Sequence, residues 1–448
     1  MLSNKVWALT PAKIILGGFF LIILGGGILL SLPISSKSGE MTPFIDAVFT
    51  ATSATCVTGL VVHDTSTYWS LFGQGVILLL IQIGGMGVVT LAIAITILSG
   101  RKIGLKQRFV MQESISAPQV GGIVRMTSFI IKSTILFEVL GALILAVQFC
   151  PQFGFLKGIW YSIFHSISAF CNAGFDLMGD TSGLYSSLTS YHSNPFVTIP
   201  IMLLIVTGGI GFFVWEDICE HKRSYKAFRL QTKIVLTTTF FLLLVPALLF
   251  FLFEFTPARW EGYTLADRIY ASLFQSVTPR TAGFNTVSLN ELSTQSQLLT
   301  IMLMIIGGSP GSTAGGIKTT TFAIAVLCIR SVFHNQEGIH CYKRRIPYEV
   351  LRNAIAILVL YLLLFLASSF LITWADGVNM MESSFEAASA IATVGLSLGI
   401  TEGLGSFSKI ILMLLMYFGR VGGLTMLYAL TNHRKFPVHL PQERVTVG

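Results

Sequence analysis

Apolar residues gather in long runs along this chain, and short stretches that carry most of the charge separate the runs. A helix needs roughly 20 apolar residues to cross a bilayer. Eight stretches reach about that length: residues 12–33, 71–98, 128–150, 195–215, 233–255, 296–329, 351–374 and 407–430. The pattern predicts an all-α polytopic membrane protein with eight transmembrane spans.

Between the two spans of each successive pair lies a segment that is too apolar for a loop and too short for a span. The four segments are residues 43–54, 159–170, 265–277 and 381–391. A helix of 12 residues is about 18 Å long, which reaches half-way through a membrane. Thr42 and Pro43 are typical of an N-cap and a first helical residue. Asp46, Asp267 and Glu382 suit the positive ends of such helices. We therefore expect four re-entrant pore helices.

One short motif follows each predicted pore helix, with glycine before a large apolar residue. Its copies are Val57-Thr58-Gly59-Leu60, Asn172-Ala173-Gly174-Phe175, Thr281-Ala282-Gly283-Phe284 and Thr393-Val394-Gly395-Leu396. Successive glycines are 115, 109 and 112 residues apart. So steady a period indicates an internal repeat. Four copies predict four walls around one axis, with backbone carbonyls that coordinate a bare cation.

The period divides the chain into four repeats and a tail. Each repeat would contain a span, a pore helix, a filter loop and a second span around a pseudo-fourfold pore. The predicted units are residues 1–100, 101–220, 221–335 with a broken second span, 336–430, and a cytoplasmic tail at 431–448. Polar residues follow the four glycines at Asp64, Asp176, Asn285 and Ser397, where they would concentrate cations at the outer mouth.

Every second span carries a glycine cluster near its middle. For residues 84–87 and 208–211 we expect close helix packing, because small residues let membrane helices approach each other. The third cluster is different. It reads Gly307-Gly308-Ser309-Pro310-Gly311-Ser312-Thr313-Ala314-Gly315-Gly316-Ile317-Lys318. Such a stretch cannot continue a helix, and irregular backbone at membrane depth is tolerated only where it is buried or lines a cavity. The sequence predicts a broken helix with a gating loop beneath the filter.

Arg420 lies inside the last predicted span. An arginine at that depth must face water or find a partner. Two interpretations stay open: it lines the cation path or pairs with carbonyls of the 307–318 loop, or it is a structural clamp between helices.

The composition and the distribution of charge are those expected of a protein embedded in a bilayer. Hydrophobic residues make up 53% of the chain and charged residues 11%, which excludes an ordinary soluble globular protein. The net charge of +8 comes mainly from the termini and the links between repeats, whereas the opposite side has Lys37, Lys157, Arg259 and Arg268. The positive-inside rule then predicts that both termini are cytoplasmic. The excess charge is a topology signal, so we expect no nucleic-acid partner.

The four-repeat pattern resembles the Trk/Ktr/HKT superfamily of potassium transporters over nearly the whole chain, and it is similar to the bacterial Ktr-type membrane subunit. The resemblance implies that Gly59, Gly174, Gly283 and Gly395 govern potassium selectivity and that residues 307–318 act as a gate. It also implies a homodimer in the bacterial plasma membrane with one pore per subunit. A cytoplasmic ring of nucleotide-binding regulatory subunits would complete the system.

The predicted function is that of the ion-translocating subunit of a potassium uptake system, with K⁺ as cargo, sodium as a candidate modulator, no covalently bound cofactor and no enzymatic activity. One glycine per repeat, where a tetrameric potassium channel has two, predicts weaker discrimination against sodium. A Na⁺- or H⁺-coupled symporter is the alternative, and Glu138 is its candidate titrating residue. A membrane-embedded enzyme would need clustered ionisable residues, which His63, His165 and His192 do not supply.

Overall fold

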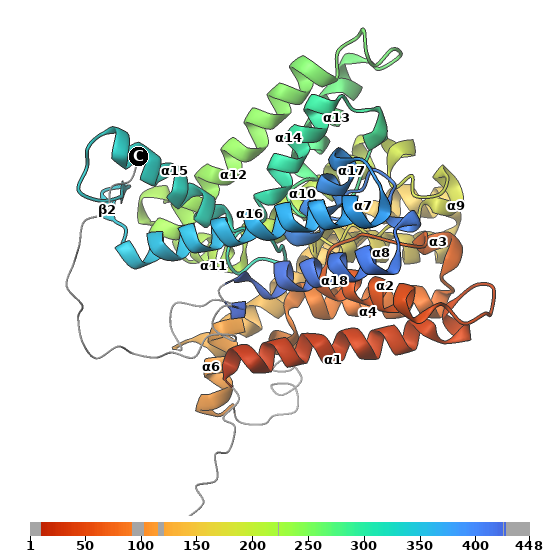
Figure 1. Cartoon of the computed structure of the whole chain (residues 1–448), viewed down its shortest axis with the longest axis horizontal. Coiled ribbons are helices and arrows are strands. Elements are labelled where there is room, and N and C mark those ends of the chain that lie inside the picture. The colour runs from red at the N-terminus through yellow and green to blue at the C-terminus, as the bar shows by residue number, and fades with distance from the viewer. Residues whose placement is uncertain (1–9, 92–102, 115–120, 223, 424, 427–448) are drawn as a thin grey trace, which may run out of the picture.

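The computed structural model describes residues 10–91, 103–114, 121–222, 224–423 and 425–426, and these are mostly helical (Figure 1). The ends of the predicted spans 71–98 and 407–430, and the tail 431–448, lie outside the described residues. The sheet found in the described part is a hairpin of two short strands, β1 (His340–Cys341) and β2 (Arg344–Arg345).

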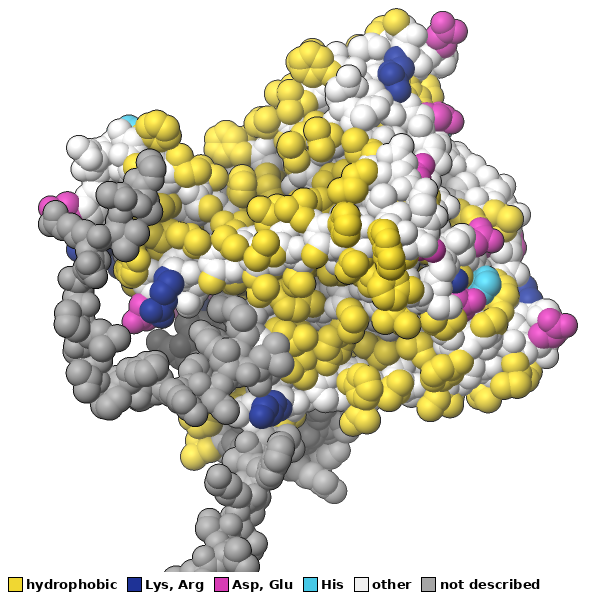
Figure 2. Space-filling model, viewed as in Figure 1, with side chains coloured by type: hydrophobic (Ala, Val, Ile, Leu, Met, Phe, Trp, Pro, Cys, Tyr) yellow, Lys and Arg dark blue, Asp and Glu magenta, His cyan; other side chains and the backbone are white. Residues whose placement is uncertain are grey.

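Four helices in the described ranges are long and apolar enough to cross a membrane. They are α1 (Pro11–Ser31), α7 (Ile123–Phe153), α12 (Leu230–Leu249) with its π-helical continuation η4 (Phe250–Glu254), and α16 (Tyr348–Asp376). A fifth candidate is a bent pair, α10 (Pro195–Ile210) and α11 (Phe212–His221), whose axes differ by 91°. Apolar side chains cover the middle of the face in Figure 2, and charged groups gather toward its ends. The chain is thus a multi-pass membrane protein.

Four shorter helices occupy the predicted pore-helix positions: α2 (Phe44–Cys56), α8 (Phe155–Phe170), α13 (Leu265–Val277) and α17 (Met380–Ala392). The start predicted for α2 is wrong by one residue, because Pro43 is the cap and the Thr42 hydroxyl instead accepts a hydrogen bond from Tyr68. The start predicted for α8 is late, because Gly154, with φ +83°, separates α7 from α8. The existence of all four helices is confirmed.

Two acidic residues act at the starts of these helices as their positions predict. Asp267 forms a capping box with Thr264 at α13, and Glu382 forms one with Asn379 at α17. In a capping box the two residues satisfy each other's free backbone N–H groups, which fixes the first turn.

The helices that follow the pore helices are α4 (Leu71–Met86), α10, α14 (Thr294–Ile305) with α15 (Thr319–Phe333), and α18 (Ser406–Val421). The predicted break in the third is confirmed. The other three are also interrupted, which was not predicted from the sequence: Gly87, Gly211 and Gly422 have φ values of +86°, +99° and +92° and end α4, α10 and α18. A left-handed residue cannot continue a right-handed helix.

Three other glycines of these clusters pack closely, which was predicted for the clusters at residues 84–87 and 208–211. Each of the three lies against a backbone carbonyl at the end of a pore helix, where an added Cβ would come within 3.0 Å of the oxygen: Gly84 meets Thr55, Gly208 meets Phe170 and Gly419 meets Ile391. All three carbonyls belong to the residue four positions before a motif glycine. The following helix therefore holds the end of its pore helix by direct backbone contact.

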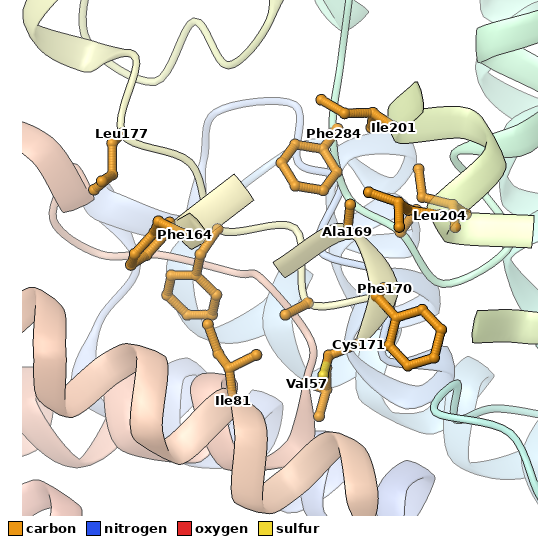
Figure 3. Packing of buried hydrophobic residues seen from close by; sticks show 14 of the residues in the cluster. Val57, Ile81, Phe164, Ala169, Phe170, Cys171, Leu177, Ile201, Leu204 and Phe284 are labelled. Atoms are coloured by element: carbon orange, nitrogen blue, oxygen red, sulfur yellow. The ribbon is translucent and has the colours of Figure 1, made fainter. Parts of the chain in front are cut away.

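Buried apolar residues surround the ends of the pore helices. Figure 3 shows side chains from α8, α4, α10 and the loops after the pore helices converging in one cluster, in which Val57 and Cys171 lie near each other. Shorter elements complete the fold: η1 (Pro33–Ser35), α3 (Thr65–Tyr68), α6 (Leu105–Ser114), α9 (Gly179–Ser182), η2 (Thr189–Tyr191), η3 (Tyr225–Ala227), η5 (Leu289–Glu291) and η6 (Thr401–Gly403).

The contact of Gly208 predicts a stability defect. In Gly208→Ala the new methyl group meets the Phe170 carbonyl, the Asn172 side chain and the Thr313 hydroxyl. Overpacking of this kind costs about 1–3 kcal/mol. Gly25→Ala in α1 is the matched control, because no atom lies within 4 Å of its added Cβ. Denaturant titration in detergent micelles should show a loss for Gly208→Ala alone, and equal stability of the two variants would contradict the packing.

Candidate cation pathway

The same unusual backbone conformation recurs after each pore helix. Two residues before each motif glycine the chain takes a left-handed conformation, at Val57 (φ +58°), Asn172 (φ +59°), Thr281 (φ +61°) and Thr393 (φ +53°). Three of these residues are β-branched, for which positive φ is strained and is usually found at functional sites. The glycines that follow have φ values of +93°, +70°, +80° and +92°. This conformation takes the carbonyls out of the helical hydrogen-bond ladder.

The four motif glycines form a closed ring. A Cβ added to any of them would lie within 3.0 Å of the carbonyl oxygen that precedes the next glycine: Gly59 meets Ala173, Gly174 meets Ala282, Gly283 meets Val394 and Gly395 meets Thr58. The order follows the chain and returns to its start. No side chain fits at these positions, so the backbones of four distant segments approach one another directly.

A hydroxyl group supports each of the four loops. Ser53 and Ser389 accept hydrogen bonds from the backbone N–H groups of Gly59 and Gly395, at 3.0 and 2.9 Å. In the other two loops a hydroxyl donates to the carbonyl after the glycine: Ser168 to Phe175 at 2.7 Å and Thr278 to Phe284 at 2.5 Å. Sequence reasoning missed these residues, although a serine stands six positions before the glycine in three of the motifs.

A cavity of about 640 Å³ lies on one side of the ring, and all four glycines line it. The predicted mouth residues Asp64, Asp176, Asn285 and Ser397 line it as well. Burial raises the pKa of Asp176 to about 7, and the neighbouring Asp64 charge adds to the rise. Asp64 caps α3 through the N–H groups of Ser66 and Thr67. The carboxylates that line the cavity attract cations, and the raised pKa of Asp176 reduces its share of the negative charge near neutral pH.

Sequence reasoning also missed Glu386, a fully buried residue of α17. Its carboxylate accepts hydrogen bonds from Ser397 and from Thr401, the latter at 3.0 Å. This holds the chain just beyond Gly395.

The loop between α14 and α15 lies against the ends of two pore helices. The Thr313 hydroxyl donates to the Phe170 carbonyl at 3.0 Å and to the Asn172 side-chain oxygen at 3.1 Å. An added Cβ at Gly315 would overlap the Thr393 side chain. The residues Asn172 and Thr393 are the left-handed residues of the second and fourth motifs, so the loop lies directly beside the ring.

Other backbone hydrogen bonds tie this loop to α10 and to itself. Ser309 and Thr313 donate their N–H groups to the Gly209 and Gly208 carbonyls at 3.0 and 3.3 Å. Within the loop, the N–H groups of Gly307 and Gly308 donate to the carbonyls of Ile317 and Gly315. The remaining predicted gate residues, Pro310, Gly311, Ser312, Ala314, Gly316 and Lys318, complete the same loop.

Two positively charged side chains of the predicted gate donate hydrogen bonds to backbone carbonyls. The Arg420 guanidinium donates to the Thr313 carbonyl in the loop and to the carbonyls of Gly84 and Gly85 in α4. Lys318 donates to the Ala314 carbonyl at 2.8 Å. The guanidinium therefore pairs with loop carbonyls, as one of the two interpretations held, and the same bonds clamp the loop to α4.

A second cavity, of about 180 Å³, lies on the loop's side of the ring. Its lining residues include Arg420, Lys318, Ser312 and Glu113.

Glu138, the candidate titrating residue of a coupled symporter, forms a hydrogen bond between helices. The Gln82 side chain donates to its carboxylate at 3.1 Å.

A ring of backbone groups between two cavities, inside a multi-pass membrane fold, defines the class of ion-transport proteins. The comparison with family models agrees: the TrkH model, described as a cation transport protein, matches residues 19–436. The chain belongs to this family of cation transport proteins. The family and its named members are transporters, and they lend no support to an enzymatic role.

Relatives match along nearly their whole length. The potassium/sodium uptake protein NtpJ of Enterococcus hirae is 37% identical over 447 residues, which cover 98% of both chains. The Ktr system potassium uptake protein B of Bacillus subtilis is 38% identical over 98% of this chain and 97% of its own. The solved structure of the potassium transporter TrkH from Vibrio parahaemolyticus matches with a TM-score of 0.73 and 19% identity, over 96% of this chain and 86% of that one.

The hydroxyl behind the fourth loop predicts a change in selectivity. In Ser389→Ala the half-buried N–H of Gly395 loses its acceptor, which costs about 1 kcal/mol, the lower end of the range for buried groups. We expect the ratio of K⁺ to Na⁺ flux to fall, as measured in proteoliposomes. Ser408→Ala is the matched control, because the Ser408 hydroxyl is buried without a hydrogen-bond partner among the described residues. An unchanged ratio in Ser389→Ala would show that the hydroxyl does not set the loop's geometry.

Proposed function

We propose that this chain is the ion-translocating membrane subunit of a potassium uptake system. The observation that carries the proposal is the closed ring in which each of four glycines contacts the carbonyl before the next. The printed names of NtpJ and of the Ktr protein, both potassium uptake proteins, support the choice of potassium.

In this proposal K⁺ is the cargo and backbone carbonyls are its ligands. Carbonyls near Thr58, Ala173, Ala282 and Val394, with those of the left-handed residues before them, replace the hydration shell of the ion. The C-terminal ends of the four pore helices add a partial negative charge at the same place. The narrow set of carbonyl sites is consistent with weaker rejection of sodium than in a two-glycine filter.

The proposed architecture has eight spans in four repeats around one pseudo-fourfold pore. The repeats are residues 1–100, 101–220, 221–335 and 336–430. The recurrence of one backbone conformation at four motifs supports it. The basic links between repeats support a topology in which both termini face the cytoplasm of a bacterial cell.

The loop at 307–318 is proposed as the gate, with Arg420 as the residue that holds it closed. The loop's place beside the ring and its bonds to Arg420 support this role. The Ktr relatives are named as components of a system, which supports control by other subunits. We extend this to a homodimer on a cytoplasmic nucleotide-binding ring, with sodium as a modulator.

The ring predicts that Gly395→Ser abolishes the preference for potassium. A serine there would adopt φ +92° and would place its Cβ against the Thr58 carbonyl of the neighbouring motif. Flux of K⁺ and Na⁺ into liposomes that contain the purified chain is the measurement. Gly399→Ser is a matched control, because it has a similar φ of +87° but its added Cβ has only the Asn290 side chain within 4 Å.

Two outcomes contradict the proposed filter. One is a Gly395→Ser variant that keeps the wild-type ratio of K⁺ to Na⁺ flux. The other is a wild-type chain that carries no monovalent cation even when a cytosolic extract supplies regulatory subunits.

The gate predicts that Arg420→Gln raises flux in the absence of other subunits. Each charge-assisted hydrogen bond that the closed loop loses is worth about 1.5–3 kcal/mol, so we expect an increase of at least about tenfold. Arg268→Gln is the control, because Arg268 also donates to a backbone carbonyl, that of Phe255, but away from the loop. A deletion of residues 309–315 provides the second variant. Unchanged flux in both would exclude gating by this loop.

A further inference from the structure

Two cavities with a shared wall lie beside the β1–β2 hairpin, away from the ion pathway. The larger, of about 670 Å³, is a groove between α12 and α15. Apolar side chains make up most of its length, among them Ile234, Phe241, Phe322 and Val326. Phe241 and Val326 are 56% and 47% exposed, so an apolar surface of this groove is open to its surroundings.

The smaller cavity, of about 370 Å³, is basic. Lys226, Lys233 and Arg344 line it. Tyr342, in the turn of the hairpin, lines both cavities and joins them. Its hydroxyl is fixed by bonds to Thr237 of α12 at 2.7 Å and to Tyr225 at 3.0 Å.

Three of the cationic side chains that line the basic cavity have no acidic partner among the described residues. No carboxylate lines either cavity among the described residues. Lys226, Lys233 and Arg344 form no ion pair in the described part of the chain, whereas Arg229, which also lines this cavity, is paired with Glu216, Asp217 and Glu220. Arg330 adds a further cation at the groove. These unpaired cations favour an anionic occupant of the basic cavity.

We propose that the two cavities form one site for an anionic phospholipid. Its phosphate would bind Lys226, Lys233 and Arg344, and one acyl chain would lie in the groove between α12 and α15. Basic pockets between membrane helices recognise acidic lipid headgroups in this way. A free phosphate would match the basic cavity alone and leave the apolar groove unused, so the combination of the two favours a lipid. The site rests on the membrane fold and is independent of the filter.

The test is lipid binding by the full-length chain in nanodiscs of phosphatidylcholine with increasing phosphatidylglycerol, read by native mass spectrometry. Removal of one surface cation weakens binding to anionic lipid by about fivefold, so Lys226→Gln with Arg344→Gln should weaken it by about 25-fold. Both side chains are exposed, so the fold should be unaffected. Arg108→Gln, an exposed cation of α6, is the matched control.

A second pair of variants tests the groove and leaves all cations in place. Thr238→Trp or Val326→Trp fills the groove and should also release phosphatidylglycerol, whereas millimolar inorganic phosphate should not displace it from the wild type. Retention of the lipid by both tryptophan variants would overturn the proposal in favour of a soluble anion or an acidic protein surface at the basic cavity. Unchanged retention in the double glutamine variant would overturn it outright. Neither readout depends on transport, so a failure of the lipid-site proposal can be distinguished from a failure of the proposed function.

Discussion

The close approach of each motif glycine to the carbonyl before the next is the contact on which the rest of the structure depends. Four segments more than 100 residues apart must meet at one place without side chains between them. Backbone cannot fill space by adjusting rotamers, so each segment has to be positioned from behind. Ser53, Ser168, Thr278 and Ser389 do this for the loops. The glycines of α4, α10 and α18 do it for the ends of the pore helices.

The third motif departs from this scheme, because the loop beside the ring interrupts the helix that follows its pore helix. Four residues before Gly283 stands Pro279, and no glycine of the following helix packs on its carbonyl within the described structure. Gly307 instead meets Gly315 and Gly316 of its own chain segment. The helix that would have supported the third pore helix is thus opened into a loop. The loop contacts the second and fourth motifs, through Thr313 and Gly315.

The ring could be predicted from the sequence because its constraint is local and repeated: a glycine with the same neighbours at a steady period. The contacts that support the ring from behind could not be predicted from the sequence. Gly84 and Gly87 belong to one cluster, yet one packs against a carbonyl and the other ends the helix, and glycine is suited to both tasks. Ser53 is one serine among many until the turn brings it beside Gly59. The partners of Arg420 lie more than 100 residues away, so no local pattern marks them.

The choice of carbonyls as partners for Arg420 matters for the proposed gate. A carboxylate would neutralise the guanidinium, and the residue would then act only as a clamp. Carbonyls of Thr313, Gly84 and Gly85 satisfy its hydrogen bonds but leave its charge in place beside the second cavity. In the proposed gate, a positive charge at that position would oppose the passage of a cation. In that proposal the guanidinium that ties the loop to α4 would also supply the electrostatic barrier, and a movement that frees Thr313 would change both at once.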